Sequence, residues 1–135
     1  MNRVESAPVD VEAIATNLGL TVIRQNLGSV SGELRGNRVK VNAQNHLVRQ
    51  RFSIAHEIGH HILHTEHDSA ASSLIERQAN AFAAALLMPA GLLRREIKRT
   101  SDFDELQRRF QVSRDALSLA LERLGLLGQV ERTSS

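Results

Sequence analysis

Cysteine, tryptophan and tyrosine are all absent from this chain of 135 residues. Without cysteine, the protein can form neither a disulfide framework nor a zinc cluster held by thiolates. Any metal ion must therefore be bound by histidine and carboxylate side chains. Without tyrosine, any side-chain hydrogen bond to a negatively charged oxygen must come from another residue type, such as histidine, arginine or asparagine.

Long hydrophobic runs are absent as well. No stretch reaches the roughly 18 apolar residues that suggest a membrane span. The first residues, MNRVESAPVDVEA, contain no hydrophobic leader region. Hydrophobic residues make up 41% and charged residues 24% of the chain, which is the balance of a folded protein rather than a disordered one. We therefore expect one cytoplasmic domain over residues 1–135, with its own core and no membrane contact.

A large excess of one charge is missing too, because the formal net charge is only +2. The isoelectric point near 9.9 resembles that of a nucleic-acid-binding protein. However, no cysteine or tyrosine titrates between histidine and lysine, so a small positive excess persists to high pH and raises the isoelectric point. The basic residues are spread along the chain and indicate a solvated surface. Direct DNA binding is therefore not expected.

Hydrophobic periodicity indicates an α+β fold with a short antiparallel strand layer, or hairpin, packed on helices. Helical patterns fall in the stretches 9–18, 52–64, 74–88, 92–99 and 103–127, the last of which contains two helices. Short strands are expected over residues 20–24 and 30–41, and the second should turn back at Gly36 and Asn37. Gly19 and Pro89 end their helices, and residues 66–73 form a loop.

The strongest chemical signal is the sequence from His56 to His60, which reads HEIGH. Residues four apart lie on one face of a helix, so both imidazoles can reach the same ion. Glu57 lies beside the pair, where a carboxylate can take a proton from water. The alternative is a solvated helix with two surface histidines. Apolar flanking residues argue against it, because they indicate a helix packed on a core.

The third ligand is less certain from spacing alone. His64 lies about 12 Å along the helix axis from His56, too far for one straight helix to wrap three histidines around an ion. We expect His64 to face a ligand or the substrate instead. The metzincin pattern HExxHxxGxxH would require glycine at 63 and histidine at 66, where this chain has Leu63 and Glu66.

Glu76 is the better candidate for the third ligand. Asn80 follows on the same helical face, where its side chain could orient a ligating histidine. The alternative is a capping box, because Ser73 and Glu76 have the spacing at which the glutamate bonds the N-terminus of its own helix. Both interpretations remain open on the residues alone.

Two segments, RQRFSIAHEIGHHILH at residues 49–64 and ERQANAFAAALLMP at residues 76–89, resemble the ImmA/IrrE metallopeptidase family. Weaker similarity extends to residues 9–22 and 106–126, so the resemblance covers most of the chain. Two motifs at this separation are far more specific than HExxH alone.

The resemblance implies a gluzincin-like site in a zincin-like core over residues 9–100, followed by a helical subregion over residues 101–127. It assigns zinc ligation to His56, His60 and Glu76, and the role of general base to Glu57. Manganese is a further candidate, because such sites accept both metals. The implied substrate is a helix-turn-helix transcriptional repressor, cleaved to derepress its genes. His64 and His61 are candidates for the charge-stabilising role that tyrosine has in many zinc peptidases. We expect no sensor domain after Ser135 and hence no regulation by an attached sensor.

The C-terminal helices resemble a helix-turn-helix, with Ser113 as the cap of the second. The prospective recognition helix, RDALSLALERLG, is mostly apolar and has few groups that could read base edges. We therefore expect this segment to be structural or to dock a partner. Two alternatives remain: a module that binds a repressor without cutting it, and a DNA-binding regulator that contacts DNA through Arg109 and Arg114.

Overall fold

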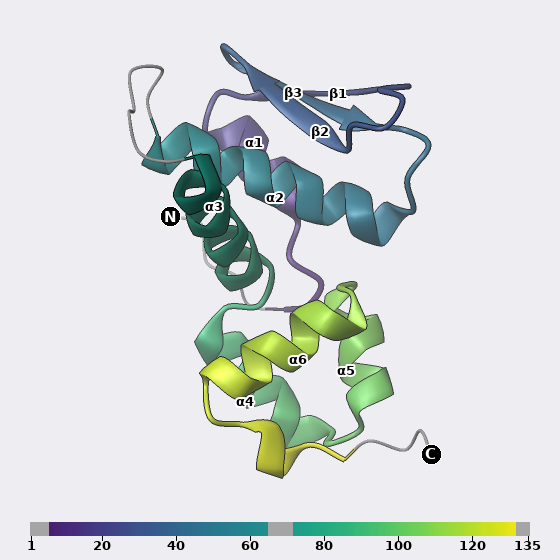
Figure 1. The fold of residues 1–135 in the computed structure, drawn as a ribbon. Helices are drawn as coiled ribbons and strands as arrows, with labels where there is room; N and C mark the ends of the chain where they lie inside the picture. The colour runs from purple at the N-terminus through teal and green to yellow at the C-terminus, as the bar shows by residue number, and fades with distance from the viewer. Residues whose placement is uncertain (1–5, 65–71, 132–135) are drawn as a thin grey trace. The chain divides into compact units, whose positions relative to one another are not determined.

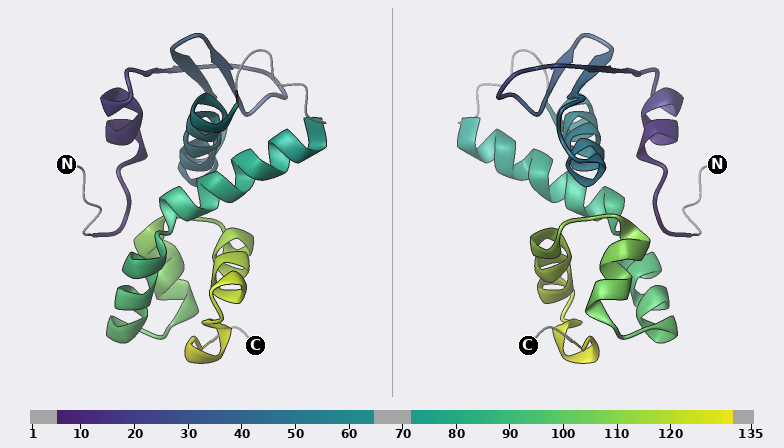
Figure 2. Two further views of the ribbon diagram at one scale, coloured as in Figure 1. Left: turned by 90° about the vertical axis from the view of Figure 1, so that its left-hand side faces the viewer. Right: turned by 90° about the vertical axis from the view of Figure 1, so that its right-hand side faces the viewer.

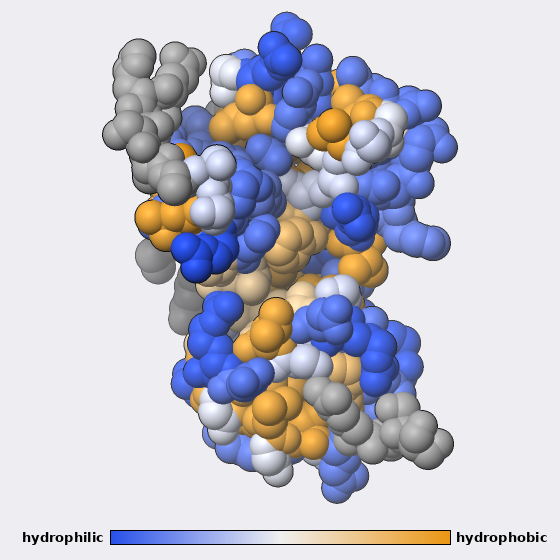
Figure 3. Space-filling view, viewed as in Figure 1, coloured by the Kyte–Doolittle hydropathy of each residue, from blue (hydrophilic) through white to orange (hydrophobic). Residues whose placement is uncertain are grey.

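The computed structural model describes residues 6–64 and 72–131, so most of the loop expected at 66–73 lies outside the described residues. The described chain forms two compact units. One contains residues between 10 and 84, and the other contains residues 6–9 with residues 85–131. The described chain contains both helices and a three-stranded sheet, which confirms the α+β part of the expected fold class. In the face shown in Figure 3, hydrophilic and hydrophobic residues are interspersed on both units.

The first unit begins with helix α1 (Val11–Asn17). Asp10 caps it by accepting a hydrogen bond from the backbone N–H of Ala13 at 3.0 Å. The helix ends where expected, because Gly19 adopts a left-handed conformation with φ of +81°. Val11 and Ala15 are buried and hold α1 on the unit.

Three strands form one sheet in the order β1-β3-β2 (Figure 1). The strands are β1 (Thr21–Gln25), β2 (Gly32–Arg35) and β3 (Arg38–Asn42). The expected hairpin is present: β2 and β3 pair antiparallel around Gly36, whose φ is +57°. The expectation of a purely antiparallel layer was wrong, because β1 pairs parallel with β3.

The crossing of the chain between β1 and β2 accounts for this parallel pairing. Val39 and Val41 are completely buried, so β3 needs cover on its face and a neighbour on each edge. After β1 the chain crosses to the far edge of the sheet, and Asn42 holds this crossing by donating hydrogen bonds to the carbonyls of Gly28 and Val30. Residues distant in sequence therefore decide the strand order.

Helix α2 (Leu47–Leu63) packs against β2 and β3 and carries the HEIGH sequence. It begins five residues earlier than expected. Gln50 explains the difference: its side chain donates to the carbonyl of Asn45 and accepts from Arg24 Nε, each at 2.8 Å. These tertiary contacts stabilise a first turn whose polar sequence has no helical hydrophobic pattern.

Helix α3 (Ser72–Leu87) crosses α2, as the two views in Figure 2 show. Gly59 of α2 makes the close approach possible. A Cβ atom there would lie 3.3 Å from both the Cα and the carbonyl oxygen of Ala79, and 3.2 Å from the Phe82 ring. The glycine within the motif therefore allows the two backbones to pack together.

The second unit is helical and contains α4 (Ala90–Arg99), α5 (Phe103–Phe110), α6 (Arg114–Arg123) and a short 3-10 helix, η1 (Leu127–Gln129). Its core is formed by fully buried side chains of Leu93, Phe103, Leu106, Phe110, Leu117 and Leu121. Ser113 caps α6 as expected, accepting from the N–H of Ala116 at 3.0 Å. Gln111 ends α5 with a φ of 52°, so a residue other than glycine occupies this left-handed turn.

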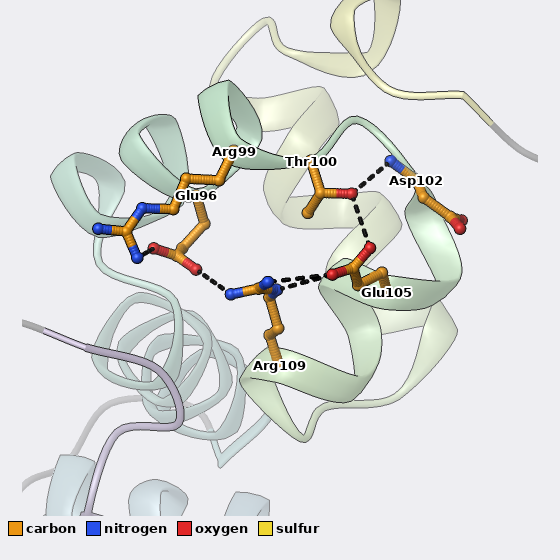
Figure 4. A network of polar contacts seen from close by, with 6 residues as sticks. All are labelled: Glu96, Arg99, Thr100, Asp102, Glu105 and Arg109. Carbon is orange, nitrogen blue, oxygen red and sulfur yellow. Dashed lines mark hydrogen bonds and ion pairs between the residues drawn. The ribbon is translucent and has the colours of Figure 1, made fainter.

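A polar network joins α4 to α5 in this unit (Figure 4). Glu96 is almost fully buried and accepts a hydrogen bond from Arg109 at 3.1 Å, while Arg99 lies 3.6 Å from its other oxygen. Arg109 also donates to Glu105, and this hydrogen bond is the main reason that the pKa of Glu105 is lowered. Thr100 donates to the same carboxylate at 3.0 Å.

Candidate metal centre

His56 and His60 point from one face of α2 toward Glu76 of α3. The Nε2 atoms of the two histidines are 3.1 Å apart. One carboxylate oxygen of Glu76 lies 3.0 Å from His56 Nε2, and the other lies 2.8 Å from His60 Nε2. The structure therefore brings together the three residues that the sequence suggested as metal ligands.

The donor set fits a small divalent cation. One ligand atom from each residue can be chosen so that all three lie within 4.8 Å of one another. Ligands at the distances usual for zinc would lie about 3.3 Å from one another around a tetrahedral centre, close to the contacts of 2.8–3.1 Å found here. Burial is the largest cause of the lowered pKa of His60, which favours the neutral imidazole that a metal requires.

The structure gives no support to the capping-box alternative for Glu76. Helix α3 begins at Ser72 among the described residues, so Ser73 lies inside the helix rather than at its cap. The carboxylate of Glu76 instead faces the two histidines.

The outward ring nitrogens of the two histidines also have partners. His56 Nδ1 lies 2.8 Å from Asn80 Oδ1, in the orienting position expected for Asn80. His60 Nδ1 lies 3.1 Å from His64 Nδ1, and His64 Nε2 lies 2.8 Å from Gln78 Oε1. His64 therefore contacts a candidate ligand rather than the ligand cluster itself. His61 is exposed and lies outside this group of contacts.

Glu57 lies on α2 between the two histidines and is only 7% exposed. Burial, followed by repulsion from Glu76 and Glu33, raises its pKa to about 7. A carboxylate with a pKa near neutrality can both accept and return a proton at physiological pH. Gly32 of β2 is next to it, since a Cβ atom at Gly32 would lie 3.6 Å from Glu57 Oε2.

Sequence reasoning missed Gln78 and the structural importance of Gly59 and Gly32. The Gln78 contact joins different helices, so no local spacing signals it. A signal did exist for Gly59: a glycine inside an apolar helix is costly unless another backbone approaches closely.

Two imidazoles, a carboxylate and a neighbouring buried glutamate define a candidate centre for metal-dependent hydrolysis. The chain belongs to the IrrE N-terminal-like domain family, the M78 peptidases, whose family model matches residues 15–122. The resemblance to the ImmA/IrrE metallopeptidases is thereby confirmed. The family is one of metallopeptidases.

A solved structure of a transcriptional regulator from Mycobacterium tuberculosis is similar in fold, with a TM-score of 0.66 at 20% sequence identity. The alignment covers 83% of this chain and 39% of the regulator, so this chain corresponds to well under half of that protein. Comparison with curated proteins gave no match. Among the described residues, no helix combines the length and apolar character needed to cross a membrane.

Proposed function

We propose that this protein is a zinc-dependent endopeptidase that cleaves a helix-turn-helix transcriptional repressor. The main support is the convergence of His56, His60 and Glu76 from two helices, in a chain that belongs to a metallopeptidase family. The gluzincin-like residue pattern, a helix with HExxH and a glutamate from the next helix, agrees with a zincin-like core.

His56, His60 and Glu76 would hold the zinc ion. When bound, zinc supplies Lewis-acid chemistry that lowers the pKa of water and polarises a carbonyl. Manganese would fit the same nitrogen and oxygen donors. Asn80 would keep His56 in the orientation in which Nε2 faces the site.

Glu57 is the proposed general base. Its carboxylate would take a proton from the water that attacks the scissile carbonyl and return that proton to the leaving amine. The buried position of Glu57 on α2, adjacent in sequence to His56, supports this role.

Strand β2 is the proposed support for an extended substrate. It lies at the edge of the sheet, and Gly32 at its start is next to Glu57. A peptide that pairs with this edge would be held by main-chain hydrogen bonds, with its backbone running past the general base. Because such pairing is independent of side chains, the sequence preference would come from other contacts.

The repressor substrate follows from the family resemblance. The alternative function is a module that keeps the fold and binds a repressor without cutting it. The deciding experiment incubates the zinc-loaded protein with a helix-turn-helix repressor encoded beside its gene. We expect cleavage that a chelator abolishes, and a Glu57→Gln variant that still binds the repressor but does not cut it. Binding without cleavage by both proteins would favour this alternative.

A further inference from the structure

Arg49 in α2 has a hydrogen-bond partner but no carboxylate partner. Its Nε atom donates to Ser31 Oγ at 2.9 Å. Within the described part of the chain no ion pair involves Arg49, whereas Arg24 of the same unit lies 2.8 Å from Glu12. Arg49 is exposed, so its two terminal amino groups remain available to a ligand.

Arg49 lies on the same face of α2 as the two candidate histidine ligands. It precedes His56 by seven residues and His60 by eleven, which are close to two and three full helical turns. At 1.5 Å per residue, His56 lies about 10 Å farther along the helix axis. Arg49 is therefore in line with the candidate metal centre, at a distance that an extended peptide of a few residues can span.

The start of strand β2 follows this face of α2. Ser31, which precedes β2, contacts Arg49, as described above. A Cβ atom at Gly32 would lie 3.3 Å from Ser53 Cβ, one helical turn after Arg49, and 3.6 Å from Glu57 Oε2. The beginning of β2 therefore lies along α2 between Arg49 and the proposed general base.

The backbone of Gly32 is oriented toward the open edge of the sheet. The N–H of Asn42 donates to the carbonyl of Ser31 at 2.9 Å. Hydrogen-bonded and non-hydrogen-bonded pairs alternate along an antiparallel ladder. Gly32, which is opposite Val41, therefore turns its own N–H and C=O away from β3. These two groups can bind the backbone of an added strand directly beside Glu57.

The direction of the added strand determines which part of a substrate meets Arg49. Antiparallel pairs are the more common and the slightly more stable kind. A peptide paired in this way would run from the Arg35 end of β2 toward Ser31, so its C-terminal part would pass Arg49. A strand rises about 3.4 Å per residue, so the 10 Å offset along α2 corresponds to about three residues.

We propose that Arg49 is a specificity-determining residue, which binds a carboxylate of the substrate about three residues C-terminal to the scissile bond. This inference rests on the proposed peptidase function and on substrate pairing with β2. A guanidinium matches a carboxylate because two of its N–H groups can donate to both oxygens. The hydrogen bond to Ser31 restricts the long side chain and so lowers the entropy cost of binding. The carboxylate belongs to an acidic side chain or to the C-terminus of the peptide.

The test uses zinc-loaded, full-length protein and two pools of short randomised peptides. The first pool is acetylated and amidated, so that only side chains provide carboxylates, and the second has free C-termini. Mass spectrometry identifies the bonds that are cut and the residues that follow them. A second measurement identifies the peptides that immobilised Glu57→Gln protein retains without cutting.

The variants are Arg49→Gln, which removes the charge, and Arg49→Glu, which reverses it. Each is made in the wild-type and in the Glu57→Gln protein. Arg38→Gln is the matched control, because it removes another exposed arginine of the same unit. Arg38 pairs with Arg35 at the end of β2 that lies farthest from Ser31.

We expect the wild type to prefer aspartate or glutamate about three residues after the cut bond, by about two- to fivefold, the usual effect of an exposed ion pair. Arg49→Gln should lose this preference, and Arg49→Glu should prefer lysine or arginine instead. Arg38→Gln should match the wild type. All variants should keep the wild-type Kd for Zn²⁺, because neither arginine is a candidate ligand. A preference confined to the second pool would assign the carboxylate to the end of the peptide.

The same acidic preference in the wild type and in Arg49→Gln would overturn the proposal, as would cleavage with no acidic preference in either pool. Failure of the proposed function would appear differently, as no cleavage of either pool by the wild type. The retained peptides then decide on Arg49. Loss of acidic peptides when Arg49→Gln is added to the Glu57→Gln protein would support its role in binding, and unchanged retention would overturn it.

Discussion

Glu57 in the first unit and Glu96 in the second are both buried carboxylates in helices, but their surroundings differ. Glu96 faces two arginines, Arg109 at 3.1 Å and Arg99 at 3.6 Å. The described residues place no cation against Glu57, and the charges that affect it most, Glu76 and Glu33, are negative.

The difference distinguishes a carboxylate that stabilises the fold from one that is suited to proton transfer. A buried charge that is paired with arginine joins two elements, as Glu96 joins α4 to α5. A buried carboxylate without such a partner destabilises its own charged form, which is the property that proton transfer near neutral pH requires. The same amino acid at similar burial is therefore suited to opposite tasks.

The largest expected effect separates the two carboxylates directly. Glu57→Gln should lower peptidase activity by about 10²–10⁴-fold, as is usual for the loss of a general base, without lowering the free energy of unfolding. Glu96→Gln should leave peptidase activity unchanged. It should lower the free energy of unfolding by about 1–3 kcal/mol, because two arginines lose their charged partner. Kinetic assays and urea unfolding of both variants measure these effects. A Glu57→Gln variant that unfolds more readily than Glu96→Gln would contradict the comparison.

Metal removal tests whether only the first unit depends on the ion. The purified protein should bind about one divalent ion per chain. A ligand at one hundred times its Kd stabilises a protein by about 2.7 kcal/mol, so a chelator should lower the melting temperature. His60→Ala should abolish binding, Glu76→Gln should weaken it strongly, and Glu57→Gln should retain it. Equal loss of metal in the Glu57 and His60 variants would make Glu57 a ligand.

A third test compares a glycine in each unit, Gly59 in α2 and Gly91 in α4, and its expected effects are smaller. Gly59→Ala should destabilise the protein by about 1–3 kcal/mol and weaken metal binding, because its Cβ would meet the backbone of Ala79 at 3.3 Å. Gly91 in α4 has nothing within 4 Å of such a Cβ. Gly91→Ala should therefore stabilise its helix by about 0.5–1 kcal/mol. Thermal unfolding measures both, and stabilisation by Gly59→Ala would show that α2 and α3 are not held together there.

The smallest expected effect concerns DNA. Arg109 and Arg114, the candidate phosphate contacts, form ion pairs with Glu96 and Asp104 within the second unit. Arg114 also lies 4.8 Å from the centre of the Phe103 ring. We expect DNA binding by the full-length protein to be weak at both low and moderate salt. Sequence-specific nanomolar binding that falls steeply with salt would instead support the DNA-binding regulator.

Local rules identified most helices and the hairpin. Gly19, Pro89 and Ser113 marked helix ends that the structure confirms within one or two residues. The early start of α2 was missed because Gln50 is stabilised by Arg24 of β1, a contact that no local pattern reports. The proposed boundary between core and C-terminal subregion at residue 100 stays a prediction, while the compact units divide after Ala84.

The sequence by itself determined the donor chemistry and the spacing. A chain without cysteine has only nitrogen and oxygen donors for zinc, and a spacing of four places His56 and His60 on one helical face. Only the tertiary structure shows that the Glu76 carboxylate faces the two histidines rather than the N-terminus of its own helix. Its position depends on how closely α3 approaches α2 at Gly59. The parallel pairing of β1 and the contact of Gln78 with His64 have the same origin: each joins segments that are distant in sequence and adjacent in space.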